Sequence, residues 1–193
     1  MTRRHAPLLL AALVSALSLS GVLAQDAGTP APGVATDLFD PAVVEATPIS
    51  GVETFTVESA EHTEEPVTYP QNPPAGGPHA PAWQKCAAYD APIRNENAVH
   101  SQEHGAVWIT YQPDLPEAEV KALDKLAETR YVLVSPYPGL EDPIVASAWG
   151  AQLRLEAADD PRLTAFIERY AGNGPEPGAN CDSGLETTVE DAG

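Results

Sequence analysis

The sequence predicts an α/β fold, in which a small mixed sheet with a β-α-β-β-α core follows an irregular, Pro-rich N-terminal half. Short apolar runs rich in β-branched and aromatic residues recur between residues 105 and 155. Segments with apolar residues at helical spacing follow the first and the last of these runs. The 20 Pro and 14 Gly in 193 residues argue against a coiled coil or a plain helical bundle.

The first expected element is a strand within residues 51–57 (GVETFTV), where Val, Thr and Phe are dense. Prolines are frequent across residues 66–92, and they disfavour both a regular helix and a central strand. Trp83 and Tyr89 lie within this stretch and offer apolar surface to bury. We therefore expect residues 66–92 to be ordered but irregular.

The core is expected to begin with residues 106–111 (AVWITY), an apolar run typical of a buried strand. A helix should follow from Pro116, where the missing N–H of proline costs nothing. The apolar positions of this helix share one face: Val120, Leu123 and Ala127. Residues 131–135 (YVLVS) predict the next strand, which Pro136 ends. This strand-helix-strand unit should cross over in the right-handed sense.

Residues 144–155 (IVASAWGAQLRL) predict one or two further strands with a hinge at Gly150. Asp159 or Asp160 is expected to cap a last helix that carries Pro161 in its first turn. The apolar stripe of this helix is formed by Leu163, Phe166, Ile167 and Tyr170. We expect both helices to pack on one face of the sheet.

The N-terminus predicts an exported protein. Arg3 and Arg4 precede an apolar stretch at 8–24 that ends in small residues, so residues 1–24 are expected to be a signal peptide cleaved after Ala24. The stretch is short and contains serines, which disfavours a permanent membrane span; an uncleaved anchor is the alternative. We expect a periplasmic, cell-envelope or extracellular protein with no transmembrane helix after cleavage.

Composition divides the rest of the chain into three parts. These are a disordered linker rich in acids, Pro and Ala at 25–47, a single globular domain at 48–185 and an acidic tail at 186–193. The 28 Asp+Glu against 10 Lys+Arg give a net charge of −18. This balance argues against binding to nucleic acid or to an anionic membrane, because both need a basic face. A metal ion and an envelope protein remain as candidate partners.

The chain has two cysteines, Cys86 and Cys181. An even pair in an oxidising compartment predicts one disulfide, which would tie the Gly- and Pro-rich C-terminal segment to the domain. The alternative is a thiolate metal ligand or a reactive thiol at Cys86.

Four histidines lie beyond the predicted signal peptide, and they suggest a metal site. His100 and His104 are four residues apart, a spacing that places both imidazoles on one face of a helical turn. His79, in a Gly- and Pro-rich loop, is the expected third ligand, and His62 is a weaker candidate. Glu103 could be a ligand, orient an imidazole from outside the coordination shell or act as a base. Imidazole ligands favour zinc or copper.

Two other functions remain open. The string HSQEH at 100–104 matches H-x-x-E-H, the inverted zinc-protease motif, in which Glu103 would be the general base of a zinc hydrolase. The motif fixes three residues only and needs a helix upstream, because Gly105 and a strand-like run follow it. Alternatively, the histidines support a structural or interaction module of the cell envelope without metal. A non-enzymatic metal-binding domain is the leading interpretation, and no residue is assigned as catalytic.

Four stretches of the sequence resemble a bacterial and archaeal family, the exported domain-of-unknown-function family numbered 3105. They are YPQNPPAGGPHAPAWQKCAAYD, VHSQEHGAVWITYQPDLP, SPYPGL and SAWGAQLRL. The family pattern falls on His62, His79, Cys86 with Tyr89, Val99 to Gly105, and Cys181. Ala87 and Ala88 depart from it, since the family often has Gly after the first Cys. The resemblance covers about residues 48–185 and implies export and an autonomous domain, but no established reaction, cofactor or partner.

Overall fold

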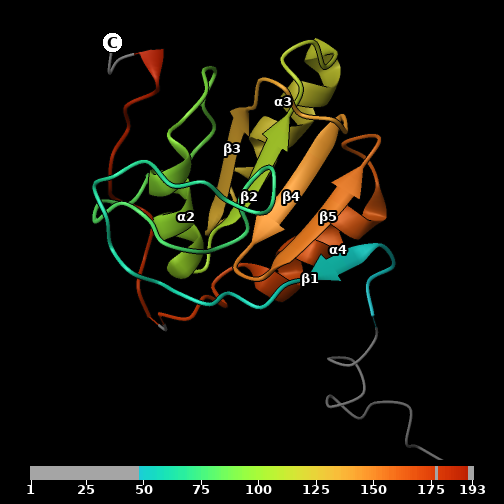
Figure 1. Ribbon diagram of the computed structural model, residues 1–193. Helices are drawn as coiled ribbons and strands as arrows, with labels where there is room; N and C mark the ends of the chain where they lie inside the picture. Colours follow the sequence, from blue (N-terminus) through green and yellow to red (C-terminus); the bar gives the residue numbers. More distant parts are fainter. Residues whose placement is uncertain (1–47, 177, 191–193) are drawn as a thin grey trace, which may run out of the picture. The chain divides into compact units, whose positions relative to one another are not determined.

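The computed structural model describes residues 48–176 and 178–190 (Figure 1). Its centre is a five-stranded mixed sheet in the order β1-β5-β4-β2-β3. The strands are β1 (Val52–Thr54), β2 (Val107–Tyr111), β3 (Val132–Pro136), β4 (Ile144–Ala148) and β5 (Ala151–Leu155). Strands β2 and β3 pair in parallel, and the other neighbours pair antiparallel. The predicted α/β class with a small mixed sheet is confirmed; residues 144–155 form two strands, so the order of the core is β-α-β-β-β-α.

Three helices accompany the sheet among the described residues: α2 (Asn95–Glu103), α3 (Glu117–Leu126) and α4 (Pro161–Tyr170). Helix α3 connects the two parallel strands, and Asp160 caps α4 by accepting a hydrogen bond from the Arg162 N–H at 2.9 Å. Gly150 forms the hinge between β4 and β5 with φ of +72°. Helices α3 and α4 pack on one face of the sheet, as expected. Their contacts there include Leu123, Leu163, Phe166 and Ile167.

Helix α2, which is not one of the two helices expected in the core, covers the other face of the sheet together with the Pro-rich segment (Figure 1). All five residues of β2 are buried, and alternate side chains of a strand point to opposite faces. Trp108 therefore needs a cover on the face away from α3, and its Nε1 donates to Ser135 Oγ at 3.0 Å. The apolar cluster on this face contains Tyr89, Ile93, Ala98, Trp108 and Leu133.

Helix α2 is polar in sequence (NENAVHSQE) yet largely buried. Its side chains donate to backbone carbonyls of the Pro-rich segment, where prolines supply carbonyl groups without supplying N–H groups. The donor–acceptor pairs are Asn97 to Ala82, His100 to Ala80, Ser101 to Gln84 and Gln102 to Pro74. Burial of a polar helix is therefore matched by hydrogen bonds to an irregular segment.

Glu96 fixes the first turn of α2 to the same segment. Its carboxylate accepts hydrogen bonds from the Val67 N–H and from the Arg94 guanidinium, each at 3.0 Å. Burial raises the pKa of the Glu96 carboxyl, but these two donors, together with the backbone N–H of Glu96 itself and the positive charge of Arg94, outweigh burial and hold the pKa below its ordinary value of 4.5.

The predicted disulfide joins Cys86 and Cys181, with a Cα–Cα distance of 5.2 Å. Backbone hydrogen bonds extend the junction on both sides: the Cys86 N–H donates to the Cys181 carbonyl at 2.7 Å, and the Lys85 N–H donates to the Leu185 carbonyl at 2.8 Å. The C-terminal segment thereby lies along the Pro-rich segment. The sulfur of Cys86 is engaged in this bond, so no thiolate ligand remains there.

The signal peptide and linker expected within residues 1–47 lie outside the described residues, as does the end of the acidic tail at 191–193. The domain limits of 48 and 185 stay a prediction. Among the helices of the described chain, none combines the length and the apolar character that crossing a membrane requires.

Replacing both cysteines by serine is expected to lower the free energy of unfolding by about 4 kcal/mol, because the disulfide closes a long loop and restricts the unfolded chain. The two cysteines are 95 residues apart. Urea unfolding of the two proteins at one temperature measures this difference. A loss below about 1 kcal/mol would contradict the loop-closure explanation.

Glu96→Gln is expected to lower the free energy of unfolding by about 1.5 kcal/mol at neutral pH, because an ionised acceptor is replaced by a neutral one. A depressed folded-state pKa contributes stability that is complete above the unfolded-state value and declines as the pH falls through the folded-state value. The difference between wild type and variant should therefore shrink below pH 4.5. Urea unfolding at neutral pH and at about pH 3 tests this; an equal difference at both would contradict it.

Candidate metal centre

All four histidines of the described chain meet beside helix α2. His62 and His79 lie next to each other because their backbones form an isolated parallel bridge. The Thr63 N–H donates to the His79 carbonyl at 2.7 Å, and the His79 N–H donates to the Glu61 carbonyl at 3.0 Å. The rings of His62, His79 and His100 are mutually 4.9 Å apart, measured between centroids.

His79 is fully buried, and both of its ring nitrogens have contacts. Nδ1 lies 2.8 Å from the carbonyl oxygen of Gly77, and Nε2 lies 3.0 Å from Oε2 of Glu103. The Glu103 carboxylate also lies 3.8 Å from Nε2 of His62, whose side chain is 51% exposed. Glu103, at the last position of α2, therefore connects a buried imidazole with an exposed one.

His100 lies at the centre of the cluster and is 4% exposed. Its Nδ1 lies 2.6 Å from the Ala80 carbonyl oxygen, and its Nε2 lies 3.1 Å from Nε2 of His104. Burial lowers the pKa of His100, and the neighbouring histidines lower it further, while the bond to Ala80 partly opposes this. The lowered pKa favours the neutral imidazole, which is the form that binds metals.

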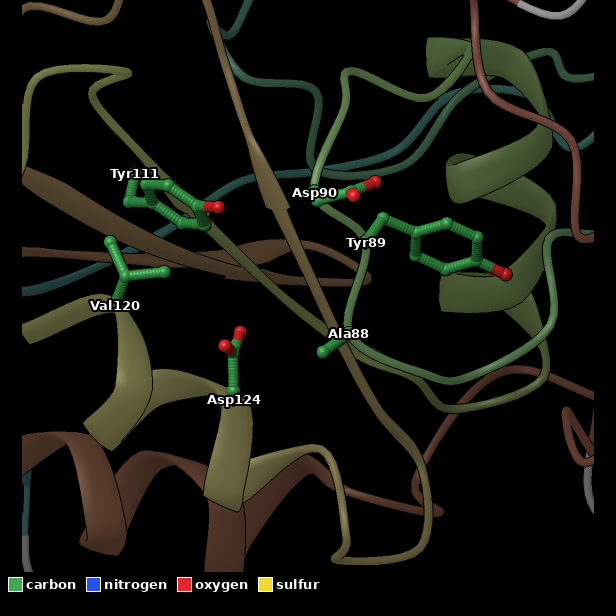
Figure 2. Close-up of a pocket in the computed structure, with 6 residues that line it drawn as sticks. All are labelled: Ala88, Tyr89, Asp90, Tyr111, Val120 and Asp124. Carbon is green, nitrogen blue, oxygen red and sulfur yellow. The ribbon is translucent and has the colours of Figure 1, made fainter. Parts of the chain in front are cut away.

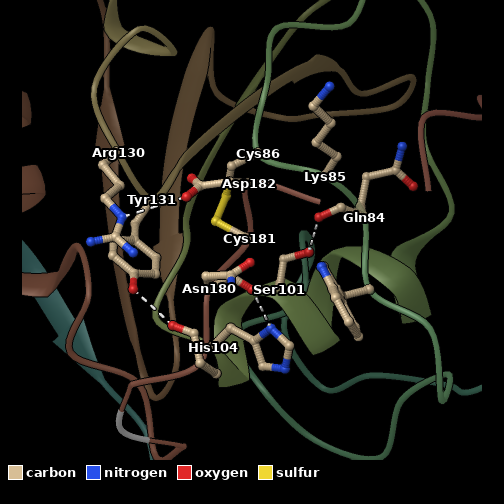
Figure 3. Close-up of a disulfide and its surroundings, with 12 residues drawn as sticks. Gln84, Lys85, Cys86, Ser101, His104, Arg130, Tyr131, Asn180, Cys181 and Asp182 are labelled. Atoms are coloured by element: carbon tan, nitrogen blue, oxygen red, sulfur yellow. Dashed lines mark hydrogen bonds and ion pairs between the residues drawn. A yellow bond between two sulfur atoms is a disulfide. The ribbon is translucent and has the colours of Figure 1, made fainter. Parts of the chain in front are cut away.

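His104 follows directly on α2, and the C-terminal segment orients its ring. Nδ1 lies 2.9 Å from the Asn180 carbonyl oxygen, next to the disulfide (Figure 3). Nε2 lies 3.1 Å from Oε2 of Glu176. The orientation of His104 and the position of Glu176 thus depend on the C-terminal segment, which the disulfide attaches to the domain.

The three buried imidazoles, His79, His100 and His104, share one arrangement. Each Nδ1 faces a carbonyl oxygen, which can only accept, so Nδ1 carries the proton and donates. Each Nε2 then presents its lone pair to another acceptor: a carboxylate, or in the pair His100–His104 a second imidazole nitrogen. Two facing acceptors repel unless a proton or a cation lies between them. The arrangement is therefore stable only if a proton or a metal cation lies between the facing atoms.

The possible ligand atoms form two groups, and within each group they lie within 4.8 Å of one another. The first group contains His62, His79, His100 and Glu103, and the second contains His100, His104 and Glu176. The expected trio is therefore divided: His79 and His104 belong to different groups, and His100 belongs to both. Two donors about 2.0–2.2 Å from a tetrahedral zinc ion are about 3.3–3.6 Å apart. The closest contacts in the cluster, at 3.0–3.1 Å, are slightly shorter, so a small outward movement of the side chains would reach that spacing.

Sequence reasoning missed Glu176. It is one of many acids in a segment without basic residues, so its type and position gave no signal. The structure brings it to the cluster through backbone contacts: the Glu176 N–H donates to the Glu103 carbonyl at 3.1 Å. At Gly174 a Cβ would lie 2.1 Å from the same carbonyl oxygen, so only glycine allows this approach.

Two half-buried tryptophans border the cluster. The centroid of Trp83 lies 4.8 Å from that of His104 and 5.6 Å from that of His100. Trp149 meets His79 edge-on at 5.8 Å. Aromatic walls limit the access of water and lower the local dielectric constant, which strengthens interactions between ligands and a cation.

The hydrolase interpretation requires Glu103 to act on a water bound to an ion at His100 and His104. The structure instead groups the Glu103 carboxylate with His62, His79 and His100, while Glu176 is the carboxylate beside His104. Nothing in this geometry favours a base role for Glu103.

A cavity of about 350 Å³ lies apart from the histidines, at the end of β2 beside α3 (Figure 2). It is lined by Ala88, Tyr89, Asp90, Tyr111, Val120 and Asp124. Burial raises the pKa of Asp124 and of Tyr111, and nearby Asp124 and Asp90 raise that of Tyr111 further. None of the predicted site residues lines this cavity.

Fold and site together define a disulfide-linked α/β domain with a buried histidine–carboxylate cluster. The chain belongs to the family described as protein of unknown function (DUF3105), whose pattern matches residues 61–183. The match includes all four clustered histidines, Glu103, Glu176 and both cysteines, and it confirms the resemblance seen in the sequence. Neither a curated protein nor a solved structure matches the chain.

Gly105→Ala is expected to lower the free energy of unfolding by about 3 kcal/mol. Gly105 has φ of +96°, and a Cβ there would lie 2.8 Å from the backbone of Gly172. The control is Gly139→Ala, at φ of +81° with no atom within 4 Å of the added Cβ. Strain alone should cost the control about 1 kcal/mol. Equal losses in urea unfolding would show that the close approach of the C-terminal segment does not matter.

Proposed function

We propose that this protein is an exported, non-enzymatic domain that binds one Zn²⁺ or Cu²⁺ ion through His79 and His100, with His62 and Glu103 completing the coordination. One observation carries the proposal. The buried imidazoles have their Nδ1 atoms bonded to backbone carbonyls, so their Nε2 lone pairs converge on carboxylates and on one another. Hydrogen bonds of this kind hold the rings of metal-binding histidines in position.

The donor atoms select the class of ion. Three imidazoles and a carboxylate supply nitrogen and oxygen, which suit Zn²⁺ and Cu²⁺. No free thiol exists among the described residues, and the single methionine of the chain is Met1. Soft sulfur ligands, which favour Cu⁺, are thus lacking in the described cluster.

Export is supported by the disulfide, because such bonds persist in oxidising compartments and are rare in the cytosol. The predicted signal peptide at 1–24 agrees with this location. The acidic composition, with a net charge of −18, attracts cations to the protein surface.

A second candidate is a metal-free structural or interaction module of the cell envelope. It is favoured by the fact that each buried imidazole has a backbone carbonyl of its own, and that Glu103 and Glu176 can each pair with a protonated histidine. In that case protons, and no metal ion, supply the positive charge. The contact between Nε2 atoms of His100 and His104 is common to both candidates, so only a measurement separates them.

Metal analysis tests the proposal directly. The exported protein, purified without a His-tag, should contain about one equivalent of zinc or copper, because the first group offers four ligands. His79→Ala/His100→Ala should lose it, whereas Asp114→Asn, which changes an exposed carboxylate elsewhere, should retain it. Elemental analysis after dialysis measures the content, and circular dichroism checks the fold.

Addition of zinc at about 100 times its Kd should raise the free energy of unfolding of the wild type by about 2.7 kcal/mol, and that of the double variant by far less. A folded wild-type protein that stays metal-free after incubation with Zn²⁺ and Cu²⁺ would overturn the proposal and leave the envelope module.

A further inference from the structure

We propose that the cluster offers one ion two mutually exclusive positions that share His100, and that the ion is transferred through the second position to an acceptor. The first position is the group of His62, His79, His100 and Glu103 proposed above, and the second is the group of His100, His104 and Glu176. This inference rests on the proposed function. It makes the protein a carrier of an exchangeable ion and not a store.

Exclusivity follows from the hydrogen bonds of His100. Its Nδ1 donates to the Ala80 carbonyl at 2.6 Å, so Nε2 is its one available ligand atom. A ring nitrogen has a single lone pair and coordinates one ion at a time. Because His100 is 4% exposed and lies inside α2, its ring is confined between the two groups. An ion at either position therefore deprives the other of a ligand.

The second position has the donor spacing of a metal site but fewer ligands. His104 Nε2 lies 3.1 Å from both His100 Nε2 and Glu176 Oε2. Two imidazoles and one carboxylate leave at least one coordination position of a tetrahedral ion empty. An acceptor that supplies a nitrogen or oxygen ligand can bind there before the protein ligands dissociate. The first position has four ligands, which can fill all four coordination sites of a tetrahedral ion.

Each position also has its own exposed ligand. The side chain of His62 is 51% exposed and that of Glu176 is 58% exposed, whereas the shared His100 is buried. His62 precedes helix α2 in the sequence and Glu176 follows helix α4, and each supplies an exposed ligand to a different position. These two exposed ligands are the points at which we expect an ion to enter and to leave.

The number of coordinated imidazoles distinguishes the two positions. Cu²⁺ is titrated into the metal-free protein, and pulsed electron paramagnetic resonance counts the imidazole ligands. We expect one equivalent in the wild type with three imidazoles. We expect His104→Gln to keep one ion with three imidazoles. His62→Gln/His79→Gln, which leaves one imidazole at the first position and two at the second, should keep one ion with two imidazoles, bound 10–100-fold more weakly. His100→Gln should weaken binding at both positions, because each of them loses the shared ligand.

Transfer is tested by the rate at which EDTA removes Cu²⁺, followed by absorbance. Glu176→Gln and His104→Gln should slow removal about tenfold with little change in affinity, because the route through the second position is impaired. Glu186→Gln is the matched control: it is an exposed acid in the same segment that pairs with Lys85. It should leave the rate unchanged. Circular dichroism checks the fold of every variant.

Three results would overturn the inference. Two equivalents bound at once in the wild type would show that the positions are not exclusive. Loss of all binding in His62→Gln/His79→Gln, with His104→Gln unaffected in affinity and in release, would leave a single position and spare the proposed function. A folded wild-type protein that binds no Cu²⁺ would remove both the second position and the proposed function.

Discussion

The histidine-bearing half of the domain depends on one constraint: the carbonyl groups of a Pro-rich segment must find hydrogen-bond donors that the segment does not supply. Helix α2 provides them from its side chains. Asn97, Ser101 and Gln102 donate to this segment, and His100 does so with a ring nitrogen. The same bonds that make the segment a stable cover for the sheet therefore fix the orientation of a central imidazole. The same hydrogen bonds thus stabilise the fold and orient a candidate metal ligand.

A second cover, the C-terminal segment, completes the arrangement from the other side. The disulfide and the backbone bonds beside it hold this segment against the Pro-rich chain, and the Asn180 carbonyl then orients His104. Glu176 reaches the same histidine from a stretch where glycine permits a very close approach to the end of α2. Regular elements supply only His100 and Glu103 to the cluster. The sheet supplies the surface against which the irregular segments pack.

The sequence predicted the parts of the fold that local patterns determine. The apolar runs gave the core strands, Asp160 with Pro161 gave the start of α4, and Gly150 gave the hinge between two strands. The two cysteines gave the disulfide because there was one possible pairing. The face occupied by α2 could not be predicted, since its polar sequence has no apolar stripe to orient it.

The sequence identified most residues of the site, but it predicted their arrangement in space only in part. The i,i+4 spacing correctly brought the rings of His100 and His104 together, at 4.7 Å between centroids. The neighbourhood of His62 and His79 depends on a backbone bridge between two irregular segments, which no local pattern announces. For the same reason His79 and His104 fell into different groups, and Glu176 was not recognised.

The residues of the histidine cluster are far apart in the sequence, and this separation has a consequence for folding. His62, α2 and Glu176 come from the beginning, the middle and the end of the described chain, so the cluster forms only after distant segments have met. Contacts of large sequence separation cost loop entropy before they yield stability, and chains rich in them fold slowly. A truncated or incompletely folded chain retains the HSQEH string but not the surrounding carbonyls that orient its rings. The assembled cluster is therefore a property of the finished tertiary structure.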